Sequence, residues 1–420
     1  MKLGMVGLGK LGTPVALSLS MKGHEVKGYD IDAGKMQKDV FPHHEVGPNG
    51  EPSIEPLLKK SNLSFGSLSE VVAHSEVIFV AVQTPHDPMY EGITRLPKER
   101  CDFDYTYLSN AVRDISNEIG QLGKDTVVII ISTVLPGTVR REIVPLINQH
   151  VKLCYNPFFI AMGTTMTNFI NPEFVLFGTL NKEATQKAKQ LYRTIHDKPF
   201  YETSIENAEL IKVAYNTYIS MKICFANVLM ETSHKVEGCN VDEVTNALAL
   251  ASDRLISPSY MSGGMGDGGG CHPRDNIALS WLAREVNLSY DWFENVMVCR
   301  ENQTEWLADL VEEHHTRKKY QHNKIGILGK AFKSGTNITT GSPALLLANI
   351  LKERAFEVQM YDPHIDDYPS PFTWSGVYIV ATNHDVFAND EWNYSQGSVV
   401  IDPWRYIPNQ NGIEIVRVGE

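Results

Sequence analysis

Gly7-Leu8-Gly9-Lys10-Leu11-Gly12 decides the fold of the N-terminal part of the chain. An apolar run at 2–6 precedes this hexapeptide, a helix-like stretch at 14–21 follows it, and a second short run at 25–29 ends in Asp30. Strand, glycine-rich turn, helix, strand and terminal acid form the dinucleotide-binding fingerprint, in which glycines let the pyrophosphate approach the backbone. The pattern predicts a Rossmann domain whose cofactor contacts Gly7, Gly9, Lys10, Leu11 and Gly12.

Asp30 indicates which dinucleotide binds. A carboxylate at the end of the second strand bonds the ribose hydroxyls and repels a 2′-phosphate, so the sequence predicts NAD rather than NADP. Thr84 and Thr133 follow two further apolar runs, at 77–82 and 126–131. Because open α/β sheets bind ligands at the carboxyl ends of their strands, we expect both threonines to lie near the cofactor.

The longest helix is predicted for residues 207–237, which contain neither glycine nor proline. Small or apolar residues recur there at intervals of three and four: Ile211, Ala214, Tyr218, Met221, Phe225 and Val228. This period is typical of a helix stripe that is buried against a partner, and it predicts a helix that links two domains and forms the core of a homodimer. Lys212 and Asn216 are one turn apart and share another face. The polar stretch 86–104 is predicted to be a surface excursion that covers the site.

A glycine-rich loop, 263–275, carries the candidate nucleophile. Six of its first eight residues are glycine, which excludes the interior of a helix or strand. Cys271 follows these glycines, and Pro273 suits the first position of a helix predicted to continue over 276–286. A thiolate at Cys271 would therefore meet backbone N–H groups at the positive end of a helix dipole. Asp275 in the first turn opposes the thiolate, so we interpret it as a group that handles protons or water.

A second α/β pattern occupies the C-terminal part of the chain. Strands are predicted at 324–328, 357–361, 377–381 and 399–401, and a helix at 342–354. Two further helices, at 242–251 and 292–314, are predicted in the middle of the chain, before this pattern. The pattern lacks GxGxxG, so we expect this domain to bind something other than a dinucleotide. Lys330, Lys333 and Arg405 are candidates to meet phosphate groups. The predicted fold class is α/β, with an N-terminal Rossmann domain, a central helical dimerisation region and a C-terminal Rossmann-like domain.

The composition excludes several classes of partner. A net charge of −12 over 420 residues argues against nucleic acid as the main partner. The six cysteines are scattered without a CxxC pair, which argues against a disulfide framework and a metal site. The sequence has no long apolar span, so we predict a cytoplasmic protein without a membrane partner.

These motifs resemble the UDP-glucose/GDP-mannose dehydrogenase family. Segment 268–275, Gly-Gly-Gly-Cys-His-Pro-Arg-Asp, is similar to the family's GGSCFPKD, and further family motifs match 208–216, Ser132-Thr133, 329–333 and Asp362-Pro363. The resemblance implies two-step, NAD-dependent oxidation of the C6 alcohol of a nucleotide sugar, with UDP-glucose favoured as the family's commonest substrate. It implies domain boundaries at 1–200, 201–316 and 317–420.

The resemblance also implies the site residues. Cys271 would be the nucleophile, Lys212, Asn216 and Asp275 would be catalytic, and Thr133 would lie near the reactive water. The nucleotide sugar would contact Lys212, Asn216, Tyr260, Gly268, Lys333 and Arg405. A cysteine fits this chemistry because a thiolate holds the aldehyde as a thiohemiacetal, which can surrender a second hydride. The thioester that results must then be hydrolysed by a positioned water.

One departure from the family concerns this hydrolysis. The family's NPEFLREG loop is represented by 156–163, in which Phe158 and Met162 stand where the family has glutamates. Either another acid, Asp275 or Asp267, helped by Thr133, positions the water, or hydrolysis is slow. We expect slow thioester hydrolysis with compensation by Asp275.

Two alternatives stay open from the sequence. β-Hydroxyacid dehydrogenases share the GLGxxG fingerprint and a Lys and an Asn on the linking helix, but they need neither a nucleophilic cysteine nor residues 324–420. A nucleotide-sugar-binding protein that has lost catalysis, or a homologue that does not hydrolyse the thioester, would also keep this scaffold.

Overall fold

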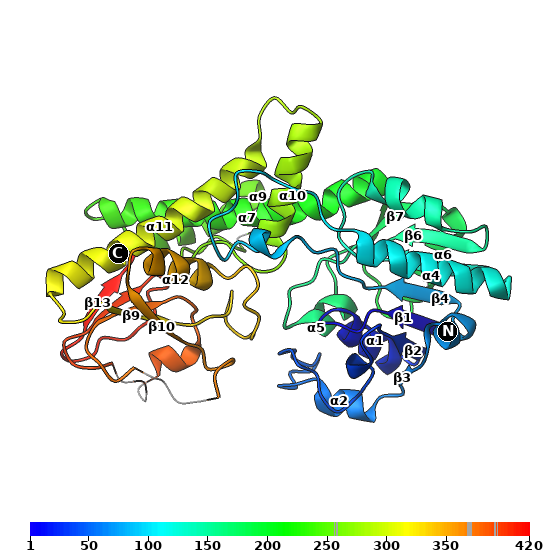
Figure 1. Ribbon diagram of the computed structural model, residues 1–420, viewed down its shortest axis with the longest axis horizontal. Coiled ribbons are helices and arrows are strands. Elements are labelled where there is room, and N and C mark those ends of the chain that lie inside the picture. The colour runs from blue at the N-terminus through cyan, green and yellow to red at the C-terminus, as the bar shows by residue number, and fades with distance from the viewer. Residues whose placement is uncertain (256, 258, 368–371, 390–391, 393) are drawn as a thin grey trace. The chain divides into compact units, whose positions relative to one another are not determined.

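The computed structural model describes the chain except for residues 256, 258, 368–371, 390–391 and 393 (Figure 1). It contains two compact units, each of which is built from more than one stretch of chain. The first unit comprises Met1–Pro85 and Phe103–Ala214, and the second comprises His86–Asp102 and Tyr215–Glu420. The predicted excursion at 86–104 therefore belongs for the most part to the second unit, although its flanking strands belong to the first.

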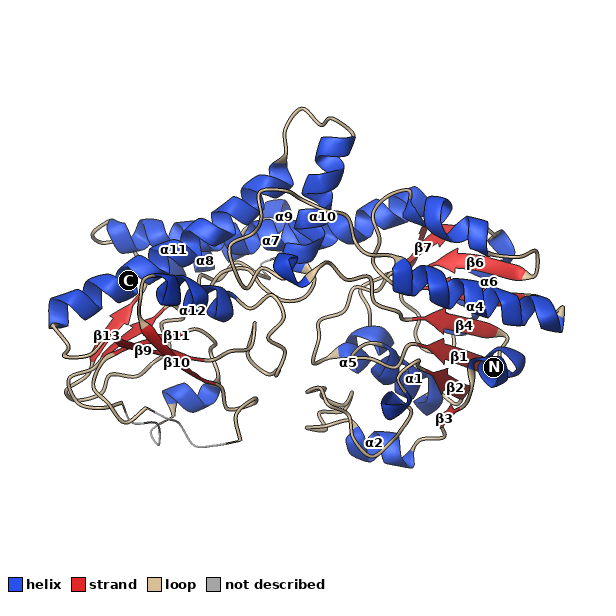
Figure 2. Cartoon of the chain, viewed as in Figure 1, coloured by secondary structure: helices blue, strands red, loops and turns tan. Residues whose placement is uncertain are grey.

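The first unit is built on an eight-stranded sheet in the order β3-β2-β1-β4-β5-β6-β7-β8 (Figure 2). All neighbours are parallel except β6 and β7, which pair antiparallel. The strands are β1 (Lys2–Val6), β2 (Glu25–Tyr29), β3 (Ser64–Phe65), β4 (Val77–Val80), β5 (Thr126–Ile130), β6 (Val151–Tyr155), β7 (Val175–Thr179) and β8 (Phe200–Thr203). β4 and β5 are buried along their whole length, as expected for parallel strands that are covered on both faces.

Six helices accompany this sheet: α1 (Gly12–Met21), α2 (Glu55–Lys60), α3 (Leu68–His74), α4 (Thr106–Leu122), α5 (Thr165–Ile170) and α6 (Lys182–Tyr192). The predicted strand–turn–helix–strand order at the N-terminus is confirmed, because β1, α1 and β2 follow one another and β1 pairs parallel with β2. The sheet order places β1, β4 and β5 side by side, and because these strands are parallel, the loops that follow them lie at the same edge of the sheet.

Among the described residues, five helices form the middle of the chain: α7 (Ile205–Lys235), α8 (Val241–Ala249), α9 (Ser252–Leu255), α10 (His272–Glu285) and α11 (Trp292–Lys318). The prediction of one long helix is confirmed by α7, which has 31 residues and continues through the division between Ala214 and Tyr215. Its predicted stripe is not buried within the chain, because Tyr218, Phe225 and Val228 are exposed. The opposite face of α7 packs inside the chain instead.

The second unit also contains a five-stranded parallel sheet in the order β10-β9-β11-β12-β13. Its strands and helix are β9 (Lys324–Leu328), β10 (Glu357–Tyr361), β11 (Val377–Val380), β12 (Val399–Asp402), β13 (Glu414–Arg417) and α12 (Pro343–Glu353). The predicted fold class, α/β with two Rossmann-like sheets and a helical middle, is confirmed. Within the described residues, no helix combines the length and apolar character that a membrane crossing requires.

Candidate active site

The turn between β1 and α1 has the geometry that a dinucleotide requires. Gly12 packs directly on the preceding turn, because a Cβ built there would lie 1.8 Å from the carbonyl oxygen of Gly7. Helix α1 begins after Leu11 without a hydrogen bond from a side-chain cap and without an acid in its first turn. Its N-terminal N–H groups and the positive end of its dipole are therefore suited to a pyrophosphate. Gly9 has open space beside it, which suits the same ligand.

Asp30 lies directly after β2, beside this turn. Its Oδ2 accepts a hydrogen bond from the backbone N–H of Leu8 at 2.7 Å, and its Oδ1 accepts one from the N–H of Asp32 at 2.9 Å. Lys35 lies 3.5 Å from Oδ1. The predicted terminal acid is thus fixed at the end of the second strand, and its contact with the ribose of NAD stays a prediction.

The loops that follow β4 and β5 are joined by hydrogen bonds. The Thr84 hydroxyl donates to the carbonyl oxygen of Thr133 at 2.7 Å, and Thr84 is buried. The second loop is anchored by Glu209 of α7, whose two carboxylate oxygens accept from the N–H groups of Gly137 and Val139 at 2.5 and 2.7 Å. Burial raises the pKa of Glu209 to about 7, although these two bonds oppose the shift. Sequence reasoning did not single out Glu209.

Lys212 belongs to the first unit and is almost fully buried. Its ammonium lies 5.2 Å from the centroid of the Phe159 ring, a cation–π distance. Phe158, which stands in place of a family glutamate, packs against the core of the first unit, with its ring centroid 5.4 Å from that of Phe169. The side chain at position 158 thus contributes to packing and provides no acid.

Cys271 is the N-cap residue of α10 in the second unit, and no side-chain hydrogen bond caps the helix there. The helix begins one residue earlier than predicted, at His272, so Pro273 is its second residue. One turn on, the fully buried Asp275 accepts a hydrogen bond from Asn216 Nδ2 of α7 at 2.6 Å and faces the Arg274 guanidinium at 3.4 Å. The structure therefore brings together three of the predicted catalytic residues, Cys271, Asn216 and Asp275, within one unit.

Helix α7 holds both ends of the glycine loop through residues that sequence reasoning missed. Asn227 accepts from the N–H of Gly264 at 2.9 Å and donates to the carbonyl oxygen of Met265 at 3.2 Å. Ser220, one turn after Asn216, accepts from Asn276 Nδ2 at 3.0 Å. Asn216, Ser220 and Asn227 are all buried. Buried polar residues on one face of a long helix were the available signal, because such groups need partners.

Helices α11 and α12 support the same loop from another side. Arg300 of α11 is fully buried, and its Nε donates to the carbonyl oxygen of Asp267 at 2.6 Å. Its Nη2 donates to the carbonyl oxygens of Gly92 and Gly341 at 2.8 and 3.3 Å. Gly268 lies against the start of α12, since a Cβ there would be 2.6 Å from Pro343 Cδ. The loop is therefore rigidly packed, and its glycines permit a close approach of backbone to side chains.

The remaining candidate substrate residues lie in the second unit. Lys333 follows Phe332, whose ring packs on Gly269 of the glycine loop. Tyr260 is half exposed and has a positive φ of 64°. Their assignment to the substrate stays a prediction.

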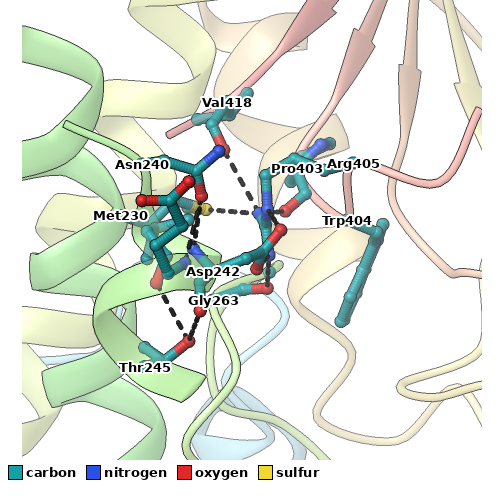
Figure 3. A network of polar contacts seen from close by, with 12 residues as sticks. Met230, Asn240, Asp242, Thr245, Gly263, Pro403, Trp404, Arg405 and Val418 are labelled. Carbon is teal, nitrogen blue, oxygen red and sulfur yellow. Dashed lines mark hydrogen bonds and ion pairs between the residues drawn. The ribbon is translucent and has the colours of Figure 1, made fainter. Parts of the chain in front are cut away.

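The Arg405 side chain forms an ion pair and hydrogen bonds with other residues of the chain (Figure 3). Its guanidinium forms a two-pronged pair with Asp242 of α8, with both N–O distances at 2.8 Å. It also donates to the carbonyl oxygens of Gly263 and Val418 at 3.0 and 3.2 Å. Arg405 thus fastens the start of the glycine loop to the C-terminal sheet, and a contact with substrate phosphate stays a prediction.

Comparison with known proteins identifies the framework. Sequence models of the UDP-glucose/GDP-mannose dehydrogenase family match three consecutive segments: the NAD binding domain at 1–196, the central domain at 206–302 and the UDP binding domain at 326–409. The first match confirms the prediction that the chain binds NAD, and the third supports a nucleotide-sugar substrate. In the described part of the chain, no group of three or more His, Cys, Asp or Glu side chains is placed to hold a metal ion.

Individual relatives agree with the family models. A GDP-mannose 6-dehydrogenase of Pseudomonas aeruginosa is 30% identical over 380 residues, which cover 87% of this chain and 82% of that protein. A UDP-glucose 6-dehydrogenase of Bacillus subtilis is 29% identical over 375 residues, covering 86% and 80%. The structure of a UDP-glucose dehydrogenase from Pyrobaculum islandicum matches with a TM-score of 0.84 at 26% identity, over 99% of this chain and 97% of that one. The chain therefore belongs to the UDP-glucose/GDP-mannose dehydrogenase family of nucleotide-sugar 6-dehydrogenases.

Proposed function

We propose that this protein oxidises the C6 alcohol of a UDP-sugar to the carboxylate, with UDP-glucose as the favoured substrate and Cys271 as the nucleophile. The observation that carries the proposal is the position of Cys271 as the N-cap of α10, one turn before the buried Asn216–Asp275 pair. A thiolate there is stabilised by the helix dipole. The glycine loop that presents it is held by α7, α11 and α12 of the same unit.

The side chains would divide the chemistry as follows. Bound NAD⁺ supplies the hydride acceptor for each of the two oxidations. Between the oxidations, Cys271 holds the aldehyde as a thiohemiacetal, which prevents its release. Asn216, oriented by Asp275, donates a hydrogen bond to the sugar oxygen on which negative charge develops, and Lys212 stabilises the same charge. A contact of Thr133 with the water that attacks the thioester stays a prediction from the family resemblance.

Hydrolysis of the thioester is the step for which the usual acid is missing. Phe158 packs in the core of the first unit and Met162 carries no proton, so neither can activate water. A general base contributes about 10²–10⁴-fold to such a step, so another residue of the chain has to activate the water. We expect a burst of two NADH per active site, followed by slower turnover limited by hydrolysis. Linear NADH formation from the first turnover, without an acyl-enzyme in the mass spectrum, would contradict this expectation.

The substrate test is a panel of UDP- and GDP-sugars with NADH formation as the readout. The UDP binding domain model and the UDP-glucose dehydrogenase relatives support a UDP-sugar. The GDP-mannose 6-dehydrogenase relative makes GDP-mannose the comparison that matters most. The proposal expects the highest kcat/KM with UDP-glucose. A higher kcat/KM with GDP-mannose would overturn the substrate, and binding of nucleotide sugars without NADH formation would identify a protein that has lost catalysis.

We also propose that the protein is a homodimer formed through α7. The exposed stripe of Tyr218, Phe225 and Val228 is an apolar helix face that the chain itself leaves uncovered. Phe225→Asp is expected to yield monomers by light scattering at micromolar concentration. Leu250→Asp, at an exposed apolar position after α8, is the matched control and should leave the mass at twice that of one chain. A wild-type monomer with full activity would refute the proposal.

A further inference from the structure

The glycine loop contains an acid–histidine pair next to the nucleophile. His272, the first residue of α10, lies with its Nδ1 2.7 Å from Oδ1 of Asp267. The Asp267 side chain is fully buried, whereas 19% of the His272 side chain is exposed. His272 follows the nucleophile directly in the chain, so the pair lies at the same helix start as Cys271.

Asp267 is fixed from two directions. Its carbonyl oxygen accepts from Arg300 Nε at 2.6 Å, and its Oδ1 meets the imidazole. Its Oδ2 is buried and has no hydrogen-bond partner among the described residues. A buried carboxylate oxygen without a donor is costly, and it indicates a place where a water or substrate group completes the bonding. The charged groups around the pair are Arg300 behind Asp267, and Arg274 and Asp275 in the first turn of α10.

The geometry determines what the imidazole can do. A carboxylate only accepts, so Nδ1 of His272 donates the proton and the ring lone pair lies on Nε2. This arrangement turns a histidine into an oriented general base. Adjacent side chains on a helix do not face one another, so His272 would reach the Cys271 adduct through a water and not directly. A base that holds a water beside an acyl group is what thioester hydrolysis needs.

We propose that His272 is the general base of thioester hydrolysis and that Asp267 is the residue that positions it. The proposal rests on the function proposed above. A water oxygen bonds to the carbonyl carbon of the Cys271 thioester while one water proton passes to His272 Nε2. The tetrahedral intermediate collapses, the C–S bond breaks, and the Cys271 sulfur leaves with the bonding electron pair. The carboxylic acid loses the second proton to solvent, and His272 returns its proton to solvent or to the thiolate.

Pre-steady-state kinetics of the full-length enzyme with NAD⁺ and its best nucleotide sugar test this assignment. His272→Phe keeps a planar ring at a partly exposed position, so the loop is expected to accept it. We expect the burst of NADH to persist, the steady-state rate to fall about 10²–10⁴-fold, and an acyl group to accumulate on Cys271 by mass spectrometry. The matched control is His150→Phe, which removes a His–Asp pair of 2.8 Å at the amino-end edge of the first sheet and should leave both phases unchanged.

A second variant tests the assignment if His272→Phe does not fold. Asp267→Asn should keep the burst and move the acid limb of the steady-state rate to lower pH, because the imidazolium loses its carboxylate partner. A steady-state rate within about twofold of wild type in His272→Phe would overturn the assignment. Loss of the burst in both variants would also overturn the assignment, because His272 and Asp267 would then act in the oxidation steps that precede hydrolysis. Absence of NADH formation by wild type with every nucleotide sugar would instead refute the proposed function itself.

Discussion

The first β–α turns of the two sheets have the same backbone. Gly7 after β1 and Gly329 after β9 have φ values of 96° and 99°, which only glycine adopts without strain. Gly7 N donates to the carbonyl oxygen of Tyr29 at 2.8 Å, and Gly329 N donates to that of Tyr361 at 2.7 Å. In each sheet an aspartate follows that tyrosine and accepts from the N–H of the next turn residue. The two turns thus share the same glycine conformation and the same pattern of hydrogen bonds.

The aspartates are used differently. Asp30 accepts from two backbone N–H groups and retains contact with the half-exposed Lys35, in the position that a ribose requires. Asp362 is fully buried and accepts from the N–H groups of Lys330 and Ala331 and from His384. Burial alone would raise the pKa of Asp362, but the bonds from His384 and these backbone groups outweigh it and hold the pKa well below its usual range. One geometry therefore supports ligand binding in the first sheet and internal bonding in the second.

The largest expected effect is on catalysis, and the same substitution should leave cofactor binding unchanged. Cys271→Ala should abolish net oxidation, lowering kcat by at least about 10³-fold, because no thiohemiacetal can form. The fingerprint Gly7–Gly12 lies in the other unit, so the variant should bind NADH as wild type does. Stopped-flow NADH formation and fluorescence titration with NADH measure the two properties. Full turnover by Cys271→Ala would remove the cysteine from the mechanism.

Asp362→Ala should give the next largest effect, on stability. The substitution leaves the N–H groups of Lys330 and Ala331 and the imidazole of His384 buried without their acceptor, which costs about 3–5 kcal/mol. We expect a lower midpoint of urea unfolding for the second unit and unchanged NADH affinity. Asp30→Ala is the matched control, because it removes the equivalent carboxylate from the first turn. Equal losses in the free energy of unfolding would show that Asp30 and Asp362 contribute equally to stability, which would contradict this expectation.

The contrast between these turns also marks the limit of prediction from sequence. Gly7 to Asp30 could be predicted because every partner lies within one local strand–turn–helix–strand unit. The backbone partners of Asp362 lie in an equivalent local unit, but His384 comes from the loop after β11, which only the folded sheet brings close. The motif could therefore be recognised, but the bond to His384 could not be predicted. Arg300 was missed for the same reason, since a cation on an apolar helix stripe gives no sign of which carbonyl groups it will meet.

Short strands were missed for a different physical reason. β8 (Phe200–Thr203) has only four residues, two of which are exposed, so its sequence lacks the apolar run that distinguishes β4. Its place in the sheet depends on pairing with β7, which is a tertiary effect. Cys271, Asn216 and Asp275 were identified together from motifs, and the 2.6 Å bond between Asn216 and Asp275 was not readable from their spacing of 59 residues.

Asp30→Ala should change cofactor choice by a smaller amount. A hydrogen bond to a charged group contributes about 1.5–3 kcal/mol, so kcat/KM for NAD⁺ is expected to fall about 10–100-fold. The variant should tolerate NADP⁺ better than wild type, because the carboxylate no longer opposes the 2′-phosphate. Steady-state kinetics with both cofactors measure this, with Asp362→Asn as the control that keeps its cofactor preference. A wild-type enzyme with equal kcat/KM for both cofactors would contradict the role of Asp30.

The smallest expected effect is on the pH dependence of stability. A fall in pH should remove a contribution from the second unit, whereas a rise in pH should remove one from the first. The pKa of Asp362 is lowered in the fold, so its contribution to stability is present above its ordinary value and is lost as pH falls. The pKa of Glu209 in the first unit is raised by burial to about 7. Its contribution is complete below its ordinary value of 4.5 and is lost as pH rises through about 7, because the unfolded chain releases its proton first.

Glu209→Gln isolates this second contribution. Glutamine cannot ionise, so the melting temperature of the variant should fall less between pH 5 and pH 8 than that of wild type, by on the order of 2–4 °C. Glutamine offers one acceptor oxygen where Glu209 bonds two N–H groups, so some loss of stability at every pH is expected. The decisive quantity is therefore the difference between the two pH values within each protein. Glu76→Gln, at the partly exposed Lys187–Glu76 pair of the first unit, is the control and should keep the wild-type slope. If Glu209→Gln and wild type lose the same number of degrees between these pH values, the buried carboxyl is ionised throughout, and the loop that carries Thr133 is held by a permanent charge.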